Sequence, residues 1–283
     1  MDMNLVLQGP NASPDCLQRI AALAGATRTV ALGEHALRCE GLAYSEALRH
    51  TIETAANAAR LDATFIAPGR LLADFKLVAM DMDSTLITIE CIDEIADMQG
   101  LKPQVADITE AAMRGELEFS ESLMRRVALL EGLDASALER VYSERLAISM
   151  GGEAMLAGVK AAGLTTLLVS GGFTFFTERL KQRLGLDFTH ANVLEIVDGK
   201  LTGRVVGGIV DADEKQRTVE RVCAQMGISP QQAIVMGDGA NDLKMMGIAG
   251  LSLAFRAKPV VRAQASIALN FTGLDGLLTI LGN

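Results

Sequence analysis

Four short segments of this chain combine carboxylate, hydroxyl and amine side chains with glycine. They are Asp81-Met82-Asp83-Ser84-Thr85, Ser170-Gly171-Gly172, Lys215 and Gly237-Asp238-Gly239-Ala240-Asn241-Asp242. The apolar run Leu77-Val78-Ala79-Met80 precedes the first segment and predicts a buried strand. Because residues i and i+2 of an extended chain point to the same side, Asp81 and Asp83 would stand together at the carboxyl end of that strand. Ligands of open α/β sheets bind at this edge, so the pair predicts a reactive site.

A divalent cation site is predicted at the same edge. Asp238 follows a second apolar run at residues 233–236, which places it in the same sheet environment as Asp81. Two carboxylates with a few further oxygens suit Mg²⁺, a hard cation that retains several waters and binds substrate phosphate. The glycines on either side of Asp238 let the backbone bend close to an ion. Asp242 is expected to orient Asp238, Lys215 or a water molecule at the ion.

The Ser170-Gly171-Gly172 segment predicts an anion site. It follows the apolar run at residues 165–169, and backbone N–H groups at such a turn can hold an oxyanion together with a hydroxyl. The alternative is a hydrolase serine in a Gly-x-Ser-x-Gly turn, but Leu168 stands where the first glycine is needed. The histidines, which lie in no motif for a general base and are interpreted as structural residues, are His35, His50 and His190.

Together the four segments resemble the signature of the haloacid dehalogenase-like phosphatases, over about residues 74–283. The string Asp81-Met82-Asp83-Ser84-Thr85-Leu86-Ile87-Thr88-Ile89-Glu90-Cys91-Ile92-Asp93-Glu94 is similar, more narrowly, to the members that act on O-phospho-L-serine. The resemblance implies a Mg²⁺-dependent phosphomonoesterase that forms an aspartyl-phosphate intermediate and releases L-serine and phosphate, the last step of serine biosynthesis. Two positions depart from the family pattern: Met150-Gly151-Gly152-Glu153 replaces a common Pro-Gly-Ala, which should affect the cap hinge, and Arg256 replaces a commoner histidine.

The resemblance also implies a role for each residue of the site. Asp81 would be the nucleophile that attacks phosphorus. Asp83 would protonate the leaving alcohol and then deprotonate the attacking water. Mg²⁺ would be held by the side chains of Asp81 and Asp238 and by the carbonyl oxygen of Asp83. The residues expected to bind the substrate are Glu90, Arg126, Ser170, Gly171, Lys215 and Asn241.

Three of these substrate-binding residues have a plainer local interpretation. A lysine that opens a helix, such as Lys215, is usually a solvated charge, but the family places a lysine between the Ser-Gly-Gly and Gly-Asp-Gly segments to hold the phosphate and the nucleophile. The resemblance implies that Glu90 faces the substrate ammonium and that Arg126 holds its carboxylate in a bidentate pair. The alternatives are a surface glutamate and one of two adjacent arginines on a helix.

The alternation of apolar and helical patterns predicts an α/β fold for residues 71–283. The sheet is expected to be Rossmann-like and mainly parallel, with helices on both faces. The expected strands cover residues 77–80, 165–169, 233–236, 251–255 and 267–269. Residues 93–145 show no strand pattern and have Gly100, Gly115 and Gly132 as breaks, so they predict several helices. The resemblance implies that these form a helical cap, inserted at about residues 90–147. Asp198-Gly199-Lys200 predicts a turn between two β-like runs.

Residues 1–70 predict a separate small α+β unit. Strands are expected at residues 3–7, 27–32, 35–39 and 63–66, and helices at 14–24 and 45–60. Ser13 is a candidate N-cap, with Pro14 in the first turn. The order β-α-β-β-α-β is the ferredoxin-like order. The unit resembles an ACT-type regulatory module.

The composition restricts the class of partner. Of the residues 49% are hydrophobic but only 4% aromatic, which predicts an aliphatic core. The net charge of −9 argues against non-specific binding to nucleic acid. The four cysteines lack metal-site or disulfide spacing, so reduced thiols and a cytoplasmic location are expected. No secretory signal is expected, and the uncharged stretch 161–177 predicts a strand and loop rather than a membrane span.

Two alternative functions are left open by the residues. One is a phosphatase or phosphotransferase of the same superfamily that acts on another small substrate, such as phosphoglycolate or homoserine. The other is a regulatory protein that binds an amino acid through residues 1–70 and catalyses nothing. A homodimer is also left open.

Overall fold

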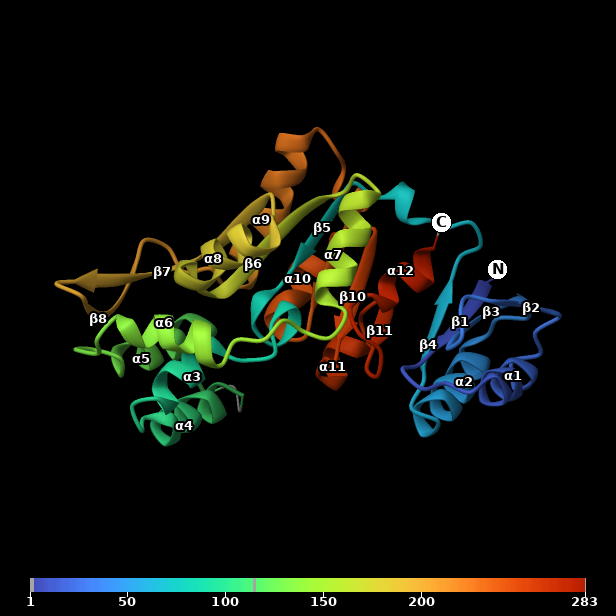
Figure 1. Cartoon of the computed structure of the whole chain (residues 1–283), viewed down its shortest axis with the longest axis horizontal. Coiled ribbons are helices and arrows are strands. Elements are labelled where there is room, and N and C mark those ends of the chain that lie inside the picture. The colour runs from blue at the N-terminus through green and yellow to red at the C-terminus, as the bar shows by residue number, and fades with distance from the viewer. Residues whose placement is uncertain (1–2, 114–115, 283) are drawn as a thin grey trace.

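The computed structural model describes residues 3–113 and 116–282. Its strands form two sheets that lie side by side along the long axis of the molecule, and a group of helices lies beyond the larger sheet (Figure 1). We call the four-stranded sheet the small sheet and the seven-stranded one the large sheet. No helix among the described residues is long and apolar enough to cross a membrane.

The small sheet is antiparallel and is covered by two helices. Its strands are β1 (Met3–Gln8), β2 (Arg28–Ala31), β3 (Ala36–Leu42) and β4 (Asp62–Ile66), in the order β2-β3-β1-β4. Its helices are α1 (Pro14–Leu23) and α2 (Glu46–Ala58). Each helix begins at a serine cap, because Ser13 accepts a hydrogen bond from the Cys16 N–H and Ser45 accepts one from the Leu48 N–H. The expected β-α-β-β-α-β order is confirmed.

Strand β1 of the small sheet buries both of its faces. Leu5 and Leu7 pack with residues of α1 and α2. Val6, between them, belongs instead to the core of the large sheet, as does Ile66 of β4. This alternation follows from the two-residue period of a strand. The face of the small sheet that its own helices leave uncovered is therefore packed against the rest of the chain.

The large sheet is mainly parallel, as expected. Its strands are β5 (Leu77–Met80), β6 (Thr165–Phe173), β7 (Phe188–Val197), β8 (Lys200–Val206), β9 (Ala233–Gly237), β10 (Leu251–Phe255) and β11 (Ile267–Leu269), in the order β11-β10-β9-β5-β6-β7-β8. Strands β7 and β8 pair antiparallel across the turn at Asp198-Gly199. Strand β5 lies at the centre of the sheet, between β9 and β6.

Helices cover both faces of the large sheet. Val78 and Met80 of β5 face one core, and Leu77 and Ala79 face the other. The first core is closed by α7 (Gly152–Ala161), α8 (Thr174–Leu184) and α12 (Gly276–Leu281). The second is closed by α9 (Ala212–Met226), α10 (Leu243–Gly247) and α11 (Pro259–Arg262). Single 3-10 turns precede β5 and β9, namely η1 (Leu72–Asp74) and η3 (Pro230–Gln232).

Strand β6 is longer than the sequence predicts. The expected strand ends at Val169, but the observed one continues through Ser170-Gly171-Gly172 to Phe173. Its pairing with β7 shifts register between Val169 and Phe173. The Ser-Gly-Gly segment is thus an irregular stretch inside a strand rather than a turn after it, because glycine interrupts the ladder without ending it.

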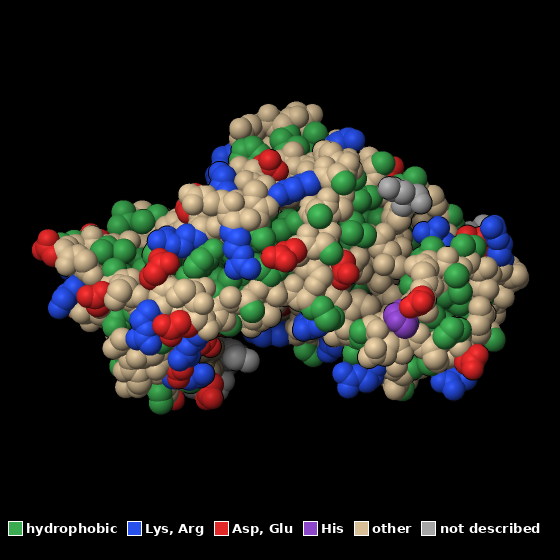
Figure 2. Space-filling model, viewed as in Figure 1, with side chains coloured by type: hydrophobic (Ala, Val, Ile, Leu, Met, Phe, Trp, Pro, Cys, Tyr) green, Lys and Arg blue, Asp and Glu red, His purple; other side chains and the backbone are tan. Residues whose placement is uncertain are grey.

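The chain between β5 and β6 forms the expected helical insertion, which we call the cap. Its helices are α3 (Cys91–Asp97), α4 (Lys102–Met113), α5 (Phe119–Ala128) and α6 (Ser136–Glu144). Gly100 and Gly132 lie in the turns that follow α3 and α5 and adopt a left-handed φ of 70° and 78°. Gly115, the third expected break, lies outside the described residues. Acidic and basic side chains are interspersed over the cap on the face drawn in Figure 2.

Two short segments attach the cap to the large sheet. The Thr88 N–H donates to the Ala147 carbonyl at 3.0 Å, and the Ser149 N–H donates to the Leu86 carbonyl at 2.9 Å. We call these two segments together the hinge of the cap.

Candidate active site

Asp81 directly follows the central strand β5. The residue is 6% exposed, and its Oδ1 accepts a hydrogen bond from the Met82 N–H at 2.7 Å. The chain then makes a single wide turn, η2 (Met82–Leu86), in which Ser84 adopts a left-handed φ of 56°. This turn leads the chain away from the sheet and into the cap, so the cap begins within a few residues of the Asp81 carboxylate.

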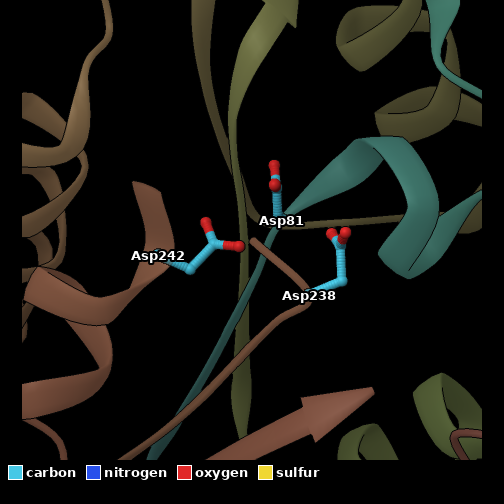
Figure 3. A group of neighbouring side chains, drawn as sticks. All are labelled: Asp81, Asp238 and Asp242. Atoms are coloured by element: carbon cyan, nitrogen blue, oxygen red, sulfur yellow. The ribbon is translucent and has the colours of Figure 1, made fainter. Parts of the chain in front are cut away.

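Three carboxylates converge at the carboxyl edge of the large sheet. Figure 3 shows Asp81, Asp238 and Asp242, whose oxygens lie within 4.8 Å of one another. Asp81 and Asp238 meet because β5 and β9 are parallel neighbours, with Met80 opposite Met236. A Cβ atom on Gly237 would lie 2.3 Å from Oδ2 of Asp242, so only glycine allows this approach.

Lys215 holds two of these carboxylates. Its Nζ lies 2.8 Å from Asp81 Oδ2 and 2.8 Å from Asp242 Oδ1, and the side chain is fully buried. It reaches them from the first turn of α9, which Asp211 caps by accepting from the Glu214 N–H. Burial alone would lower the pKa of Lys215, but Asp242 and Asp81 raise it above its usual value. Lys215 is therefore a buried lysine that contacts Asp81, and not a solvated charge at the start of a helix.

Asp242 orients the lysine, one of its expected roles. Its Oδ1 accepts from Lys215, and its Oδ2 accepts from the Gly239 N–H at 3.1 Å. Gly239 precedes the 3-10 turn η4 (Ala240–Asp242). Asp242 is fully buried, whereas Asp81 and Asp238 line the cavity at this edge of the sheet, so these two are the better candidates for holding an ion.

The electrostatics of the cluster fit a divalent cation. Burial, followed by the charge of Asp242, raises the pKa of Asp81 well above its usual value, and Lys215 only partly opposes this. Burial and Asp242 also raise the pKa of Asp238 to about 6. Three carboxylates therefore surround a single ammonium, and the cluster is rich in oxygen ligands. Oxygen ligands of this kind suit Mg²⁺.

Asp83 lines the same cavity as Asp81 and Asp238. Its Oδ1 accepts from the Cys91 N–H at 3.1 Å. Burial, followed by the nearby charge of Glu90, raises the pKa of Asp83 to about 7. A Cβ on Gly172 would lie 2.7 Å from Oδ2 of Asp83. The second glycine of Ser170-Gly171-Gly172 therefore lets strand β6 approach the Asp83 carboxylate.

A buried asparagine holds the Ser-Gly-Gly segment in place. Asn192 Nδ2 donates to the Gly171 carbonyl at 2.7 Å, and Asn192 Oδ1 accepts from the Val210 N–H at 2.8 Å. Ser170 Oγ accepts from the Gly172 N–H at 2.9 Å. Sequence reasoning missed Asn192 because it belongs to no local motif, and its role depends on segments about twenty residues away on either side.

The cap contributes a pair of opposite charges. Ser84 Oγ donates to Glu90 Oε1 at 2.7 Å. Burial lowers the pKa of Arg126 on α5, while Asp93, Glu90 and Asp83 act to raise it. The guanidinium therefore lies among three acids. Asp93 was not singled out from the sequence, although its buried Oδ1 has no hydrogen-bond partner among the described residues.

One cavity of about 720 Å³ joins these groups. The predicted site residues that line it are Asp81, Asp83, Glu90, Arg126, Ser170, Gly171, Asp238 and Asn241. Lys215 is not among the residues that line the cavity and contacts it through the Asp81 carboxylate. Phe119 and Lys258 also line the cavity and were not predicted. Within the described chain, none of the three histidines contributes to its wall, in keeping with their structural interpretation.

Comparison of this chain with known proteins identifies its family. The model of the haloacid dehalogenase-like hydrolases matches residues 75–250. A curated phosphoserine phosphatase of Polaromonas sp. is 57% identical over 219 residues, which cover 76% of this chain and 93% of that protein. The chain belongs to the haloacid dehalogenase-like hydrolases. The matched residues contain every predicted site residue.

Two solved structures extend this likeness to the haloacid dehalogenase-like fold. A probable phosphoserine phosphatase of Vibrio cholerae, in unliganded form, is 35% identical with a TM-score of 0.84, covering 99% of this chain and 86% of that one. A structure described as a phospho-aspartyl intermediate analogue of phosphoserine phosphatase is 38% identical with a TM-score of 0.69. It covers 74% of this chain and 99% of that one, so its length corresponds to the catalytic part alone.

Proposed function

We propose that this chain is a phosphoserine phosphatase, which hydrolyses O-phospho-L-serine to L-serine and phosphate. One observation carries the substrate class: a single cavity is lined by Asp81, which Lys215 contacts, and also by Glu90 and Arg126. The first pair suits a phosphate, and the second suits the ammonium and carboxylate of an amino acid. The 57% identical relative is itself a phosphoserine phosphatase.

The phosphoryl group is transferred to Asp81 and then to water. Asp81 attacks phosphorus, and an acyl phosphate forms as the serine alcohol leaves. Lys215, at 2.8 Å, fixes Asp81 Oδ2 and places a positive charge beside the phosphoryl oxygens. Ser170, Gly171 and Asn241 hold the remaining oxygens from the opposite wall. The 38% identical structure of a phospho-aspartyl intermediate analogue supports this route.

Asp83 acts as the acid and the base. It donates a proton to the leaving serine oxygen and later accepts one from the attacking water. A group that performs both steps works best with a pKa near the operating pH. The raised pKa of Asp83, about 7, meets this requirement.

The residues present fit a bound Mg²⁺. The Asp81 and Asp238 side chains and the Asp83 carbonyl would hold it. When bound, the ion would balance the charge of the acidic cluster and help to neutralise the substrate phosphate.

Arg126 and Glu90 select the amino acid. The guanidinium of Arg126 pairs with the substrate carboxylate in place of its present acidic neighbours, and Glu90 receives the ammonium. Both residues belong to the cap, so correct substrate binding depends on the cap position.

The proposal extends to the whole chain. Residues 1–70 form an ACT-like domain, and residues 71–283 form the phosphatase domain with its cap at about 90–147. The βαββαβ order and the two separate sheets support this division. The four cysteines are free thiols, in keeping with a cytoplasmic enzyme of serine biosynthesis.

Phosphate release from a panel of phosphorylated metabolites tests the proposal. With Mg²⁺, we expect O-phospho-L-serine to be hydrolysed with the highest kcat/KM, and phosphoglycolate, which lacks the ammonium, much more slowly. Chelation should abolish the activity and added Mg²⁺ should restore it. A preference for phosphoglycolate would favour another substrate, and binding of serine without turnover of any phosphate ester would favour a regulatory protein.

A further inference from the structure

Two buried polar side chains join the small sheet to the rest of the chain. Gln8 of β1 and Asp62 of β4 lie opposite one another in the strand ladder and are 3% and 1% exposed. Gln8 Nε2 donates to the Gly276 carbonyl at 3.1 Å, at the start of α12. Asp62 contacts the segment just before it, residues 270–275, which we call the junction loop.

The junction loop closes around the Asp62 carboxylate. Oδ1 accepts from the Asn270 N–H at 2.7 Å. Oδ2 accepts from the Thr272 N–H at 2.9 Å and from Thr272 Oγ at 2.7 Å. The Phe271 N–H lies within 3.3 Å of both oxygens. Three consecutive N–H groups and a hydroxyl thus converge on one buried carboxylate. Hydrogen bonds to a charged acceptor are stronger than neutral ones, so the carboxylate fixes the loop conformation.

The junction loop also contacts Met150 and Gly151, which directly follow the hinge of the cap. The Leu274 N–H donates to the Met150 carbonyl at 2.8 Å. A Cβ on Gly273 would lie 2.5 Å from that same carbonyl oxygen, and one on Gly151 would lie 1.9 Å from Oδ1 of Asp275. The two backbones are therefore in such close contact that a shift of the loop must shift Met150 and Gly151.

The hinge leads directly to the site. The Ser149 N–H, next to Met150, donates to the Leu86 carbonyl at 2.9 Å. Leu86 ends the η2 turn that begins after Asp81, and its N–H lies 3.3 Å from the Asp81 carbonyl. Hydrogen bonds and the short backbone segments between them therefore connect Asp62, in the small sheet, with the base of the cap.

We propose that Asp62 is a positioning residue for the phosphatase reaction. By fixing the junction loop it fixes Met150 and Gly151, and so sets the angle at which the cap presents Arg126 to the substrate. This inference rests on the proposed function, in which Arg126 binds the substrate carboxylate. The small sheet then contributes to substrate affinity without touching the substrate.

The full-length Asp62→Asn variant tests this role. Its volume is unchanged, but an amide N–H replaces one acceptor oxygen and opposes the N–H groups of the junction loop. Hydrogen exchange of the Leu274 and Ser149 amides should become faster without substrate. The KM for O-phospho-L-serine should rise at least about threefold. The kcat/KM for p-nitrophenyl phosphate, which has no amino-acid group for the cap to hold, should change less than about twofold.

Thr272→Val, which removes only the hydroxyl, should change the hinge exchange and the KM in the same direction as Asp62→Asn, but more weakly.

Ile52→Val is the matched control. Ile52 is fully buried in the core of the small sheet, so this change weakens that core without contacting the junction loop. We expect its hinge exchange and KM to equal those of the wild type. Unchanged hinge exchange in Asp62→Asn, or an equal loss of both activities at constant KM, would overturn the positioning role. If the wild type fails to hydrolyse phosphoserine, the proposed function fails, while hinge exchange still decides whether Asp62 controls the hinge.

Discussion

Lys215 contacts the carboxylates of Asp81 and Asp242 and so holds them together. In the proposed mechanism Asp81 has to be ionised and correctly oriented to act as a nucleophile, yet burial raises its pKa. The ammonium at 2.8 Å opposes that shift and restrains one carboxylate oxygen. Asp242 holds Lys215 from the other side, so the lysine cannot turn away into solvent. The pair keeps Asp81 in one orientation before the substrate arrives.

We expect Asp81→Asn to lose at least about a thousandfold in kcat while retaining its fold. An amide is a poor nucleophile and a weaker ligand for Mg²⁺. Circular dichroism checks the fold, and phosphate release checks the activity. Beryllium fluoride, which mimics an acyl phosphate, should bind the wild type and not the variant. Asp15→Asn, on an exposed turn of α1, is the control and should match the wild type. Normal turnover by Asp81→Asn would exclude the aspartyl-phosphate route.

Arg126→Ala should separate substrate recognition from phosphate chemistry. The lost bond to a charged group is worth about 1.5–3 kcal/mol, so kcat/KM for phosphoserine should fall about tenfold to a hundredfold. Activity on p-nitrophenyl phosphate should change far less. Glu90→Gln should show the same selectivity in milder form, because its amide oxygen still accepts a hydrogen bond.

The neighbouring arginine supplies the control for this prediction. Arg125 is on the same helix, but it is exposed and pairs with Glu121 one turn away. Arg125→Ala should leave both activities unchanged. Equal losses of the two activities in Arg126→Ala would mean that this arginine supports the cap fold and that serine recognition lies elsewhere.

At the scale of the element, strand β6 matters because it continues past its regular pairing. The register shift between Val169 and Phe173 frees the Ser-Gly-Gly backbone from the ladder with β7. Asn192 then takes over the Gly171 carbonyl and connects this stretch with Val210. The segment is thereby held in place, with Ser170 and Gly171 in the wall of the cavity where an anion would bind.

Gly172→Ala should damage this arrangement selectively. The added methyl would lie 2.7 Å from Asp83 Oδ2 and 2.8 Å from the Met82 side chain. The acid–base carboxylate must then move, so kcat should fall at least about tenfold. Phosphoserine and p-nitrophenyl phosphate should be affected alike. Gly208→Ala, where a Cβ meets nothing within 4 Å, should be silent in the same assay. A fully active Gly172→Ala would show that Asp83 does not need its present position.

Local patterns were sufficient for most elements of the large sheet and for the acidic motifs. Strands β5, β10 and β11 begin and end where their apolar runs predict. Residues whose roles depend on distant segments gave no such signal. Asp62 is separated by about 210 residues from the loop that it binds, and a lone Asp in a strand has no local pattern that predicts such a partner. The end of β6 was missed because glycine usually indicates a turn.

At the scale of the whole molecule, our proposals divide catalysis and positioning between the two sheets. The small sheet lies at one end of the molecule, and the cap lies toward the other end, below strands β7 and β8 of the large sheet (Figure 1). The 57% identical relative is covered almost completely by 76% of this chain, so a protein close to the size of the catalytic part exists by itself. This supports our proposal that residues 71–283 contain the chemistry and that the small sheet is an addition to them.

A truncated chain that starts at Arg70 tests this division. Arg70 keeps its own contacts with the catalytic part, because it donates to the Gly250 carbonyl at 2.9 Å and stacks over Phe75. We expect kcat for p-nitrophenyl phosphate to stay within about threefold of the wild type, because no proposed site residue is removed.

Two further properties should change in this truncated chain. Its melting temperature should fall, because the apolar surface that Val6 and Ile66 now cover becomes exposed to water. The KM for phosphoserine should rise as in Asp62→Asn, because the junction loop loses the same carboxylate. Calorimetry and steady-state kinetics measure both changes. A folded truncated chain without turnover would place part of the catalytic machinery in the small sheet, whereas an unchanged KM would mean that the junction loop holds the hinge without help from Asp62.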